Sequence, residues 1–164
     1  MKNFFLLLLI FISISWRGSE ALSNLSQYES KNSLSISIQN VLEEYSKNKP
    51  IDIHVSIKNL SNETILLNNR CSVGVEVLFE ITKSSGVKIR PKKIVYLGSP
   101  SKDNLIELSK GKTFEFMVDI TQFYELDENG QYNVKAIYNP YNGDLKDVWS
   151  EEIESNIVNF LVTE

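Results

Sequence analysis

Apolar and polar residues alternate with a period of two over several short stretches of the chain. Leu34, Ile36 and Ile38 alternate with serines, and apolar residues hold every odd position of residues 51–58. Successive side chains of a β-strand point to opposite faces, so this period predicts strands with one buried face. Strand-like patterns also occur in residues 64–67, 74–82, 87–90, 94–97, 105–108, 113–120, 132–138 and 156–163.

The spacing of these stretches predicts the fold class. They recur about every ten residues with no long helical period between them, which is typical of an all-β sandwich or barrel. Residues 41–47 fit either a short helical turn or a strand continuation, and residues 121–125 fit one helical turn. The alternation predicts a core formed by Ile53, Val55, Ile57, Val77, Phe79, Ile81, Phe114, Phe116, Val118, Val134, Ala136, Val158, Phe160 and Val162.

One local string narrows the fold further. Residues 126–134 run Leu-Asp-Glu-Asn-Gly-Gln-Tyr-Asn-Val, the form of a tyrosine corner, in which a Tyr hydrogen-bonds backbone a few residues upstream. We therefore predict structural roles for Gly130, which permits the turn, and for Tyr132, which holds the crossover between sheets. With the strand spacing, this favours an immunoglobulin-like Greek-key β-sandwich of about seven to nine strands.

The N-terminus has the pattern of an export signal. A short cationic start precedes an apolar run over residues 4–12, which is too short for a membrane span of about 20 residues but fits a secretory signal. Small residues stand at Ser19 and Ala21, the −3 and −1 positions of a cleavage site. We predict a signal peptide over 1–21, a flexible leader over 22–32 and the sandwich domain over 33–164, with an uncleaved membrane anchor as the alternative. The protein is expected to be secreted, periplasmic or extracellular, without stable membrane insertion after cleavage.

Composition excludes several classes of protein. Lys and Arg number 17 against 21 Asp and Glu, giving a net charge of −4, so the basic excess of a nucleic-acid binder is missing. The chain has one Cys and one His, which are too few for a Cys/His zinc site or an internal disulfide. Cys71 begins a strongly apolar stretch, so a buried role is favoured over pairing between chains. We predict no metal and no cofactor.

Catalytic constellations are weak. Asp52, His54 and Ser56 suggest a triad, but residues two apart on a strand are about 6.6 Å apart, whereas a nucleophile and its base need about 2.6–3.2 Å. The carboxylates of the C-terminal half fit a solvated rim better than a glycosidase pair. Asp144 and Asp147 lack the spacing of an EF-hand calcium loop. The chain is therefore predicted not to be an enzyme.

The best candidate for binding is the loop over residues 139–149. It joins the last two strands, where variable-type sandwiches carry a recognition loop. Tyr, Trp and Asn are efficient contact residues, so the predicted binding residues are Tyr141, Asn142, Asp144 and Trp149. The alternative is an ordinary hairpin with Trp149 folded onto the core. Glycosylation sequons, which matter only in a eukaryotic source, begin at Asn24, Asn59 and Asn62.

A family resemblance rests on turn and core positions in residues 50–61, 108–114, 129–136 and 149–158. Over residues 33–163 the order resembles the small sandwich attached to secreted deuterolysin-type metallopeptidases and, more loosely, the sandwiches of the intracellular proteinase inhibitor type. No HExxH motif is present, and the predicted signal peptide disagrees with an intracellular inhibitor. The resemblance therefore implies a stand-alone accessory or binding module without peptidase activity.

The leading hypothesis is an exported, non-enzymatic module that recognises a protein partner, with a proteinase as one option. The alternatives are a carbohydrate-binding module, a cell-surface structural module that assembles by strand addition at an unpaired edge, and a hydrolase that uses Asp or Glu. The identity of the partner and the oligomeric state stay open.

Overall fold

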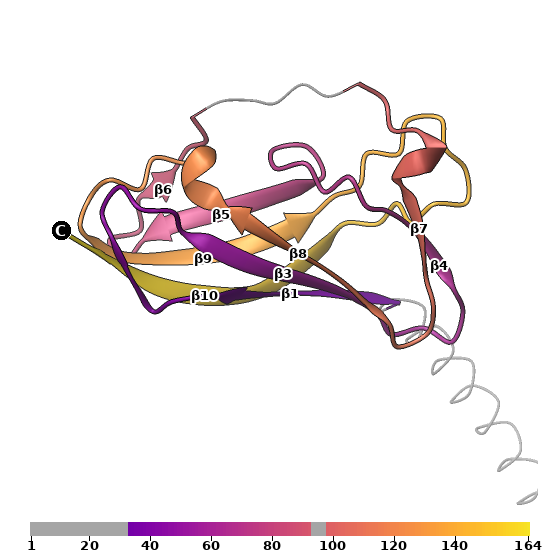
Figure 1. Ribbon diagram of the computed structural model, residues 1–164, viewed down its shortest axis with the longest axis horizontal. Coiled ribbons are helices and arrows are strands. Elements are labelled where there is room, and N and C mark those ends of the chain that lie inside the picture. Colours follow the sequence, from indigo (N-terminus) through magenta and orange to yellow (C-terminus); the bar gives the residue numbers. More distant parts are fainter. Residues whose placement is uncertain (1–32, 93–97) are drawn as a thin grey trace, which may run out of the picture. The chain divides into compact units, whose positions relative to one another are not determined.

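The computed structural model describes residues 33–92 and 98–164, which form ten strands and two short 3-10 helices (Figure 1). The predicted signal peptide, the leader and the predicted strand over residues 94–97 lie outside the described residues. The elements are β1 (Leu34–Asn40), β2 (Glu44–Ser46), β3 (Asp52–Asn59), β4 (Ile65–Asn68), β5 (Val77–Lys83), β6 (Lys88–Ile89), η2 (Lys102–Asn104), β7 (Leu105–Leu108), β8 (Thr113–Asp119), η3 (Ile120–Gln122), β9 (Gly130–Tyr138) and β10 (Ile153–Thr163).

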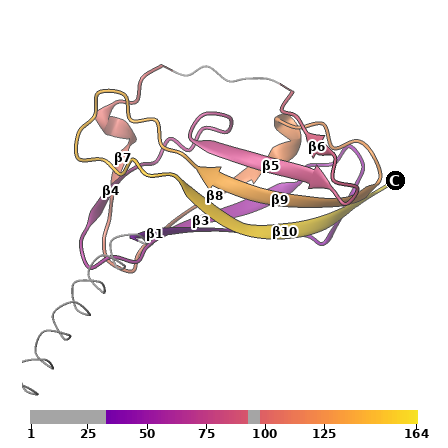
Figure 2. The same cartoon turned by 180° about the vertical axis from the view of Figure 1, so that it is seen from behind.

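The strands form two main sheets. One has the order β1-β3-β8 and the other the order β2-β10-β9-β5-β6, while β4 and β7 pair as a small third sheet. Figures 1 and 2 show the two main sheets as layers, each in front when seen from its own side. The predicted all-β sandwich of immunoglobulin type is confirmed. It has ten strands rather than seven to nine, and one of them, β2, comes from residues 41–47, where a helical turn was the other option.

The core lies between the two layers and follows the predicted alternation. Inward-facing side chains of β3, β5 and β9 are buried. Phe114, Phe116 and Val158 were also predicted as core, but they are only half-buried and pack against its margin. For the two phenylalanines the reason is position, because β8 is an edge strand of its sheet.

The strand predicted over residues 74–82 begins later than its apolar pattern suggests. Residues 72–76 form a tight turn in which the N–H groups of Val75, Glu76 and Val77 all donate to the Ser72 carbonyl, at 3.1, 3.0 and 3.1 Å. Gly74 has φ +86° in this turn, a region that glycine enters without steric cost. The strand β5 therefore starts at Val77.

Tyr132 and Gly130 hold the crossover into β9. The Tyr132 hydroxyl donates to the Glu128 carbonyl at 2.7 Å, and its ring is fully buried and stacked on Phe160 with centroids 5.7 Å apart. Gly130 has φ +142°, which favours glycine. This is the geometry of a tyrosine corner, and it ties the turn before β9 to the core.

Candidate functional site

The loop over residues 139–149 divides into structural and exposed members. The Asn142 side-chain amide donates to the Trp149 carbonyl at 2.7 Å. The backbone N–H of Trp149 donates to the Leu66 carbonyl at 2.9 Å, and the Trp149 ring packs against the core. Tyr141 is 47% exposed and Asp144 is exposed. Of the four predicted binding residues, Asn142 and Trp149 thus hold the loop in place, and Tyr141 and Asp144 offer surface to a partner; their binding role stays a prediction.

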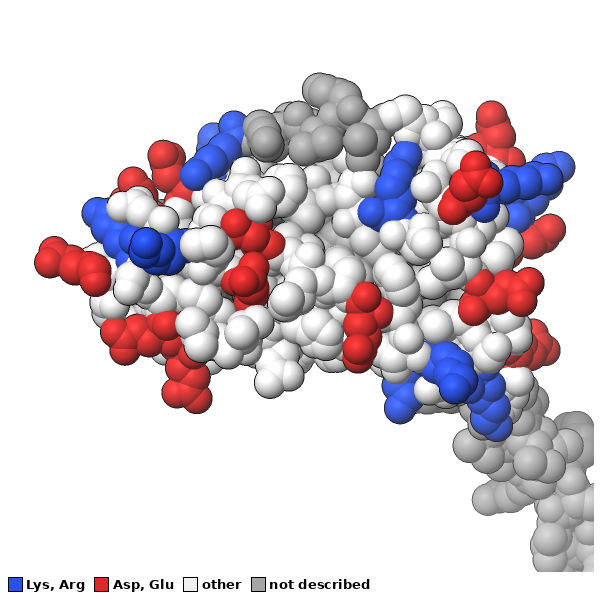
Figure 3. All heavy atoms as spheres, viewed as in Figure 1, with Lys and Arg blue, Asp and Glu red and all other residues white. Residues whose placement is uncertain are grey.

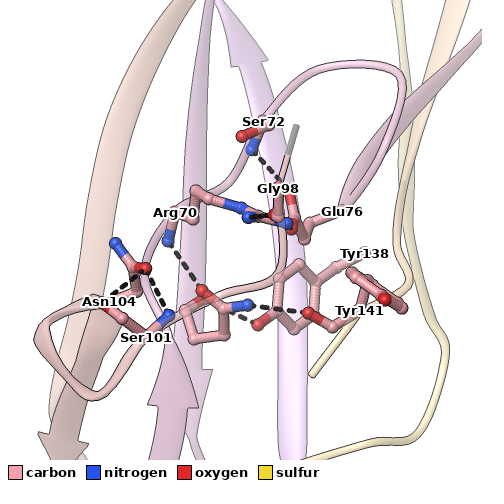
Figure 4. A network of polar contacts seen from close by, with 9 residues as sticks. Arg70, Ser72, Glu76, Gly98, Ser101, Asn104, Tyr138 and Tyr141 are labelled. Carbon is pink, nitrogen blue, oxygen red and sulfur yellow. Dashed lines mark hydrogen bonds and ion pairs between the residues drawn. The ribbon is translucent and has the colours of Figure 1, made fainter. Parts of the chain in front are cut away.

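A buried ion pair closes the turn before β5 (Figure 4). The Glu76 side chain is completely buried, and its Oε1 accepts from Arg70 Nε at 2.7 Å and also from Arg70 Nη2. Its Oε2 accepts from the Ser72 N–H at 3.1 Å. Arg70 Nη1 also donates to the Gly98 carbonyl at 2.5 Å. A buried charge is tolerated only when it is paired and hydrogen-bonded, and these contacts meet that condition.

Asn68 and Tyr138 connect this turn to the loop after β9. The Tyr138 hydroxyl donates to the Asn68 carbonyl at 2.9 Å, and Asn68 Nδ2 donates to the Tyr141 carbonyl at 3.1 Å. Asn68 Oδ1 accepts from the Arg70 N–H at 3.0 Å. Burial, with smaller effects of Cys71 and Glu76, raises the pKa of Tyr138 well above its usual value. The neutral hydroxyl therefore acts as a donor that fixes one end of the sandwich.

Cys71 lies in the same turn and is buried. Burial and, second, the charge of Glu76 raise the pKa of its thiol to about 12. The thiolate is the reactive form of cysteine, so the buried thiol is chemically quiet at neutral pH. The structure places Cys71 in the buried role that the sequence favoured.

A groove of about 400 Å³ separates this turn from strand β8. One wall is residues 69–73 and the other is β8 with the segment after it. Phe114 and Phe116 stand side by side along it with ring centroids 5.6 Å apart. The middle of the face that Figure 3 shows is mostly uncharged. The groove therefore has a mixed lining beside the strand edge, with apolar side chains along most of β8 and polar ones, such as Asn69, Arg70 and Gln122, around them.

The edge of β8 that borders this groove is open. Ile120 N–H bonds the Ile51 carbonyl and Asn59 N–H bonds the Lys112 carbonyl, both at 3.0 Å, so the even-numbered residues of β8 direct their backbone groups to β3. Alternation then directs the backbone N–H and C=O of Thr113, Glu115 and Met117 away from β3. Within residues 33–92 and 98–164, β8 has no ladder partner other than β3.

On the opposite edge of the same sheet, one residue of β1 has its outward backbone groups paired. The backbone N–H of Ile38 in β1 donates to Asn156 Oδ1 at 2.9 Å, and Asn156 Nδ2 donates back to the Ile38 carbonyl at 3.0 Å. Asn156 lies where the register of β10 against β9 shifts. The Asn156 side-chain amide thus pairs with the middle of β1 as a strand would, whereas no described residue pairs with the outward groups of β8.

The outward face of β3 and β8 carries the histidine that suggested a triad. His54 Nε2 lies 3.9 Å from Glu115 Oε2, and the Ser56 hydroxyl donates to Glu115 Oε1 at 3.2 Å. Glu115 of the neighbouring strand thus takes the place that a triad would give to Asp52. In the described part of the chain, no three His, Cys, Asp or Glu side chains are grouped to hold a metal. No helix there is long and apolar enough to span a membrane.

Two parts of this site escaped sequence reasoning. Glu76 falls within the strand predicted over residues 74–82 and Arg70 lies outside the predicted strands, and their contact depends on the turn between them. The open edge of β8 had one usable signal. Its sequence TFEFMVD has neither Lys nor Pro, the residues with which proteins commonly protect an exposed edge.

Comparison with known families identifies a family for this chain. Residues 33–163 match the family described as flagellar collar protein C, N-terminal domain. The chain belongs to this family. The match runs from just before β1 to the end of β10, so the flagellar collar protein C domain and the sandwich coincide. This family is neither the deuterolysin-associated sandwich nor the proteinase inhibitor sandwich, and those two resemblances gain no support.

No curated protein matches this member of the collar family. Among solved structures it is similar to a chain from the Salmonella enterica SafA pilin in complex with the SafB chaperone, with 11% identity and a TM-score of 0.32. That alignment covers 78% of this chain and 53% of the other. The chain thus spans about half the length of its solved neighbour, and a likeness this distant carries no functional argument.

Proposed function

We propose that the chain is a non-enzymatic structural module of a flagellar collar in the cell envelope, and that it works by protein–protein contact. The observation that carries this proposal is the family match over residues 33–163, which covers the whole sandwich. The proposal takes up the alternative of a cell-surface structural module. A proteinase as the partner has no support and is left aside.

The construction of the domain suits such a role. A structural block must keep its shape under load, and the buried contacts of Arg70, Glu76 and Tyr138 fix the loops at one end. Tyr132 holds the crossover into β9. A rigid scaffold of this kind leaves the open edge of β8 and its groove as a surface for contact.

The predicted signal peptide agrees with a place in the cell envelope. Fractionation of source cells, with detection by an antibody against the sandwich domain, tests this part. We expect the protein in the envelope fraction with residues 1–21 removed. Recovery of the whole chain from the cytoplasm would contradict it.

The structural role is tested in the source cells. Deletion of residues 33–163 is expected to remove density from the flagellar collar in electron cryotomograms. A strain carrying Asn62→Ala, an exposed surface change, serves as the control and should keep the collar. An unchanged collar after the deletion would overturn the proposed function.

A further inference from the structure

We propose that the open edge of β8 is a strand-addition site, which binds an extended segment of a partner protein with apolar side chains at alternate positions. The inference deepens the proposed function, since it names the contact by which the module joins its neighbours. It rests on three features: the unpaired backbone groups of β8, the groove beside them, and the absence, among residues 33–92 and 98–164, of a device that protects this edge.

The first feature determines the chemistry of the partner. Thr113, Glu115 and Met117 each direct one backbone N–H and one C=O away from β3. No hydrogen bond to another described residue reaches these outward groups. Donors and acceptors that alternate along a line at strand spacing are complementary to the backbone of another strand.

The second feature selects the side chains of that strand. A strand paired to β8 would lie about 4.8 Å from it, and so within the groove bounded by β8 and residues 69–73. Its inward side chains would meet Phe114 and Phe116 on one side and Val73 on the other. Both phenylalanines are only half-buried, and they gain burial when apolar side chains cover them.

The third feature is the contrast between the two edges of one sheet. Proteins protect exposed edges with Lys, Pro, bulges, inward-pointing charges or a covering group. On the β1 edge, Asn156 covers the backbone groups of Ile38, at the middle of the strand. β8 contains no Lys or Pro. Of its two charged residues, Glu115 lies on the exposed outer face, and Asp119, at the end of the strand, accepts hydrogen bonds from the backbone N–H groups of Ile51 and Thr121. An edge left open opposite one that is covered at its middle is the arrangement expected of a docking strand.

The test uses a substitution that changes only the outward side of β8. The Glu115 N–H points away from β3, so Glu115→Pro keeps the β3 ladder, removes one outward donor and places a ring where the added strand would lie. Proline is tolerated at such edge positions. The matched control is Glu115→Ala, which loses the same contacts to Ser56 and His54 but keeps the N–H.

The probe is a displayed library of peptides of about nine residues, a common strand length, with alternate positions restricted to Val, Ile, Leu and Phe. Enriched peptides are measured against the full chain by fluorescence anisotropy. We expect Glu115→Pro to lower the affinity about tenfold or more, and Glu115→Ala to change it by less than about threefold. Failure to enrich any peptide, or equal affinity for both variants, would overturn the inference.

Amide hydrogen exchange tests the same inference in the unsubstituted chain. With a bound peptide, the amides of Glu115 and Met117 in the unsubstituted chain should exchange more slowly, while those of Phe114 and Phe116 are already protected by β3. Slower exchange elsewhere and not at β8 would contradict strand addition.

Dimerisation of the free chain, if Glu115→Pro abolishes it, would show that a second copy occupies the edge. That result would overturn the choice of a distinct partner. If deletion of residues 33–163 removes collar density but no peptide binds the chain, this inference is refuted and the proposed function stands.

Discussion

Asn59 is a buried polar residue whose removal should weaken the fold more than any surface change. It ends β3, and its side chain is fully buried. The Nδ2 group donates to the carbonyls of Glu63 and Leu108, both at 2.7 Å. The Oδ1 atom accepts from the N–H and the hydroxyl of Ser61, both at 2.8 Å. One amide thus shapes the loop after β3 and ties it to the end of β7.

The Asn59→Ala change removes all four hydrogen bonds. A typical hydrogen bond contributes about 0.5–1.5 kcal/mol net, and a buried group left without a partner costs about 1–3 kcal/mol. The bond to Leu108 is buried, so its carbonyl loses a partner that water does not readily replace. We expect the free energy of unfolding to fall by about 3 kcal/mol, which lowers the melting temperature of a domain of this size by about 10 °C.

Urea denaturation followed by circular dichroism measures this loss, with thermal melting as a second measure. The matched control is Asn62→Ala in the same loop, because Asn62 is exposed and only accepts from Lys110 Nζ at 2.6 Å. That change should cost less than about 0.5 kcal/mol. A loss below about 1 kcal/mol for Asn59→Ala, or equal losses for both variants, would refute the reasoning.

Two further substitutions and one labelling experiment test other parts of the structure. Tyr132→Phe keeps the buried ring and loses the 2.7 Å bond to Glu128, so urea denaturation should show a loss of about 1 kcal/mol; no loss would contradict a tyrosine corner. Because burial raises the pKa of the Cys71 thiol to about 12, mass spectrometry should find the native chain unlabelled by iodoacetamide at pH 8 and the unfolded chain labelled; rapid native labelling would contradict this. Burial raises the pKa of Asp119, but hydrogen bonds, chiefly from Thr121, outweigh it and leave the pKa lowered from 3.8. A carboxyl with a lowered pKa contributes stability that is present above its ordinary pKa and is lost as pH falls through its folded pKa. Hydrogen bonds to a charged acceptor are stronger than those to a neutral one, so Asp119→Asn should lower the free energy of unfolding by about 1 kcal/mol at pH 7. It should also flatten the acid side of the stability curve, and an unchanged acid side would refute the role of the carboxylate.

Strand positions were predictable where one face of a strand is buried along its whole length. Alternation located β3 and β9 to within about two residues, because both are central strands packed on one face. It failed at residues 72–76, where the apolar pattern continues through a turn held by the Ser72 carbonyl. Composition does not distinguish a backbone turn of this kind from the strand that follows it.

The candidate site was harder to predict, because each part depends on contacts between distant segments. Asn59 and Asn62 each begin a glycosylation sequon and lie three residues apart, yet only Asn59 is buried. Phe114 and Phe116 follow the inward alternation expected of core residues, and only the sheet order makes them the border of a groove. The loop over residues 139–149 was recognisable, but the structural use of Trp149 depends on its contact with Leu66.

Strand addition to β8 would also explain how one module can join neighbours without a large specific interface. Backbone hydrogen bonds supply affinity that depends little on the partner's sequence, and specificity comes from the alternate side chains that enter the groove. Here the groove wall at residues 69–73 is held by Glu76 through Arg70 and Ser72. Because removing one partner of a buried ion pair is strongly destabilising, the wall of the groove and the stability of this end of the sandwich depend on the same contacts. A partner that binds here therefore recognises a surface that forms only when the domain is correctly folded.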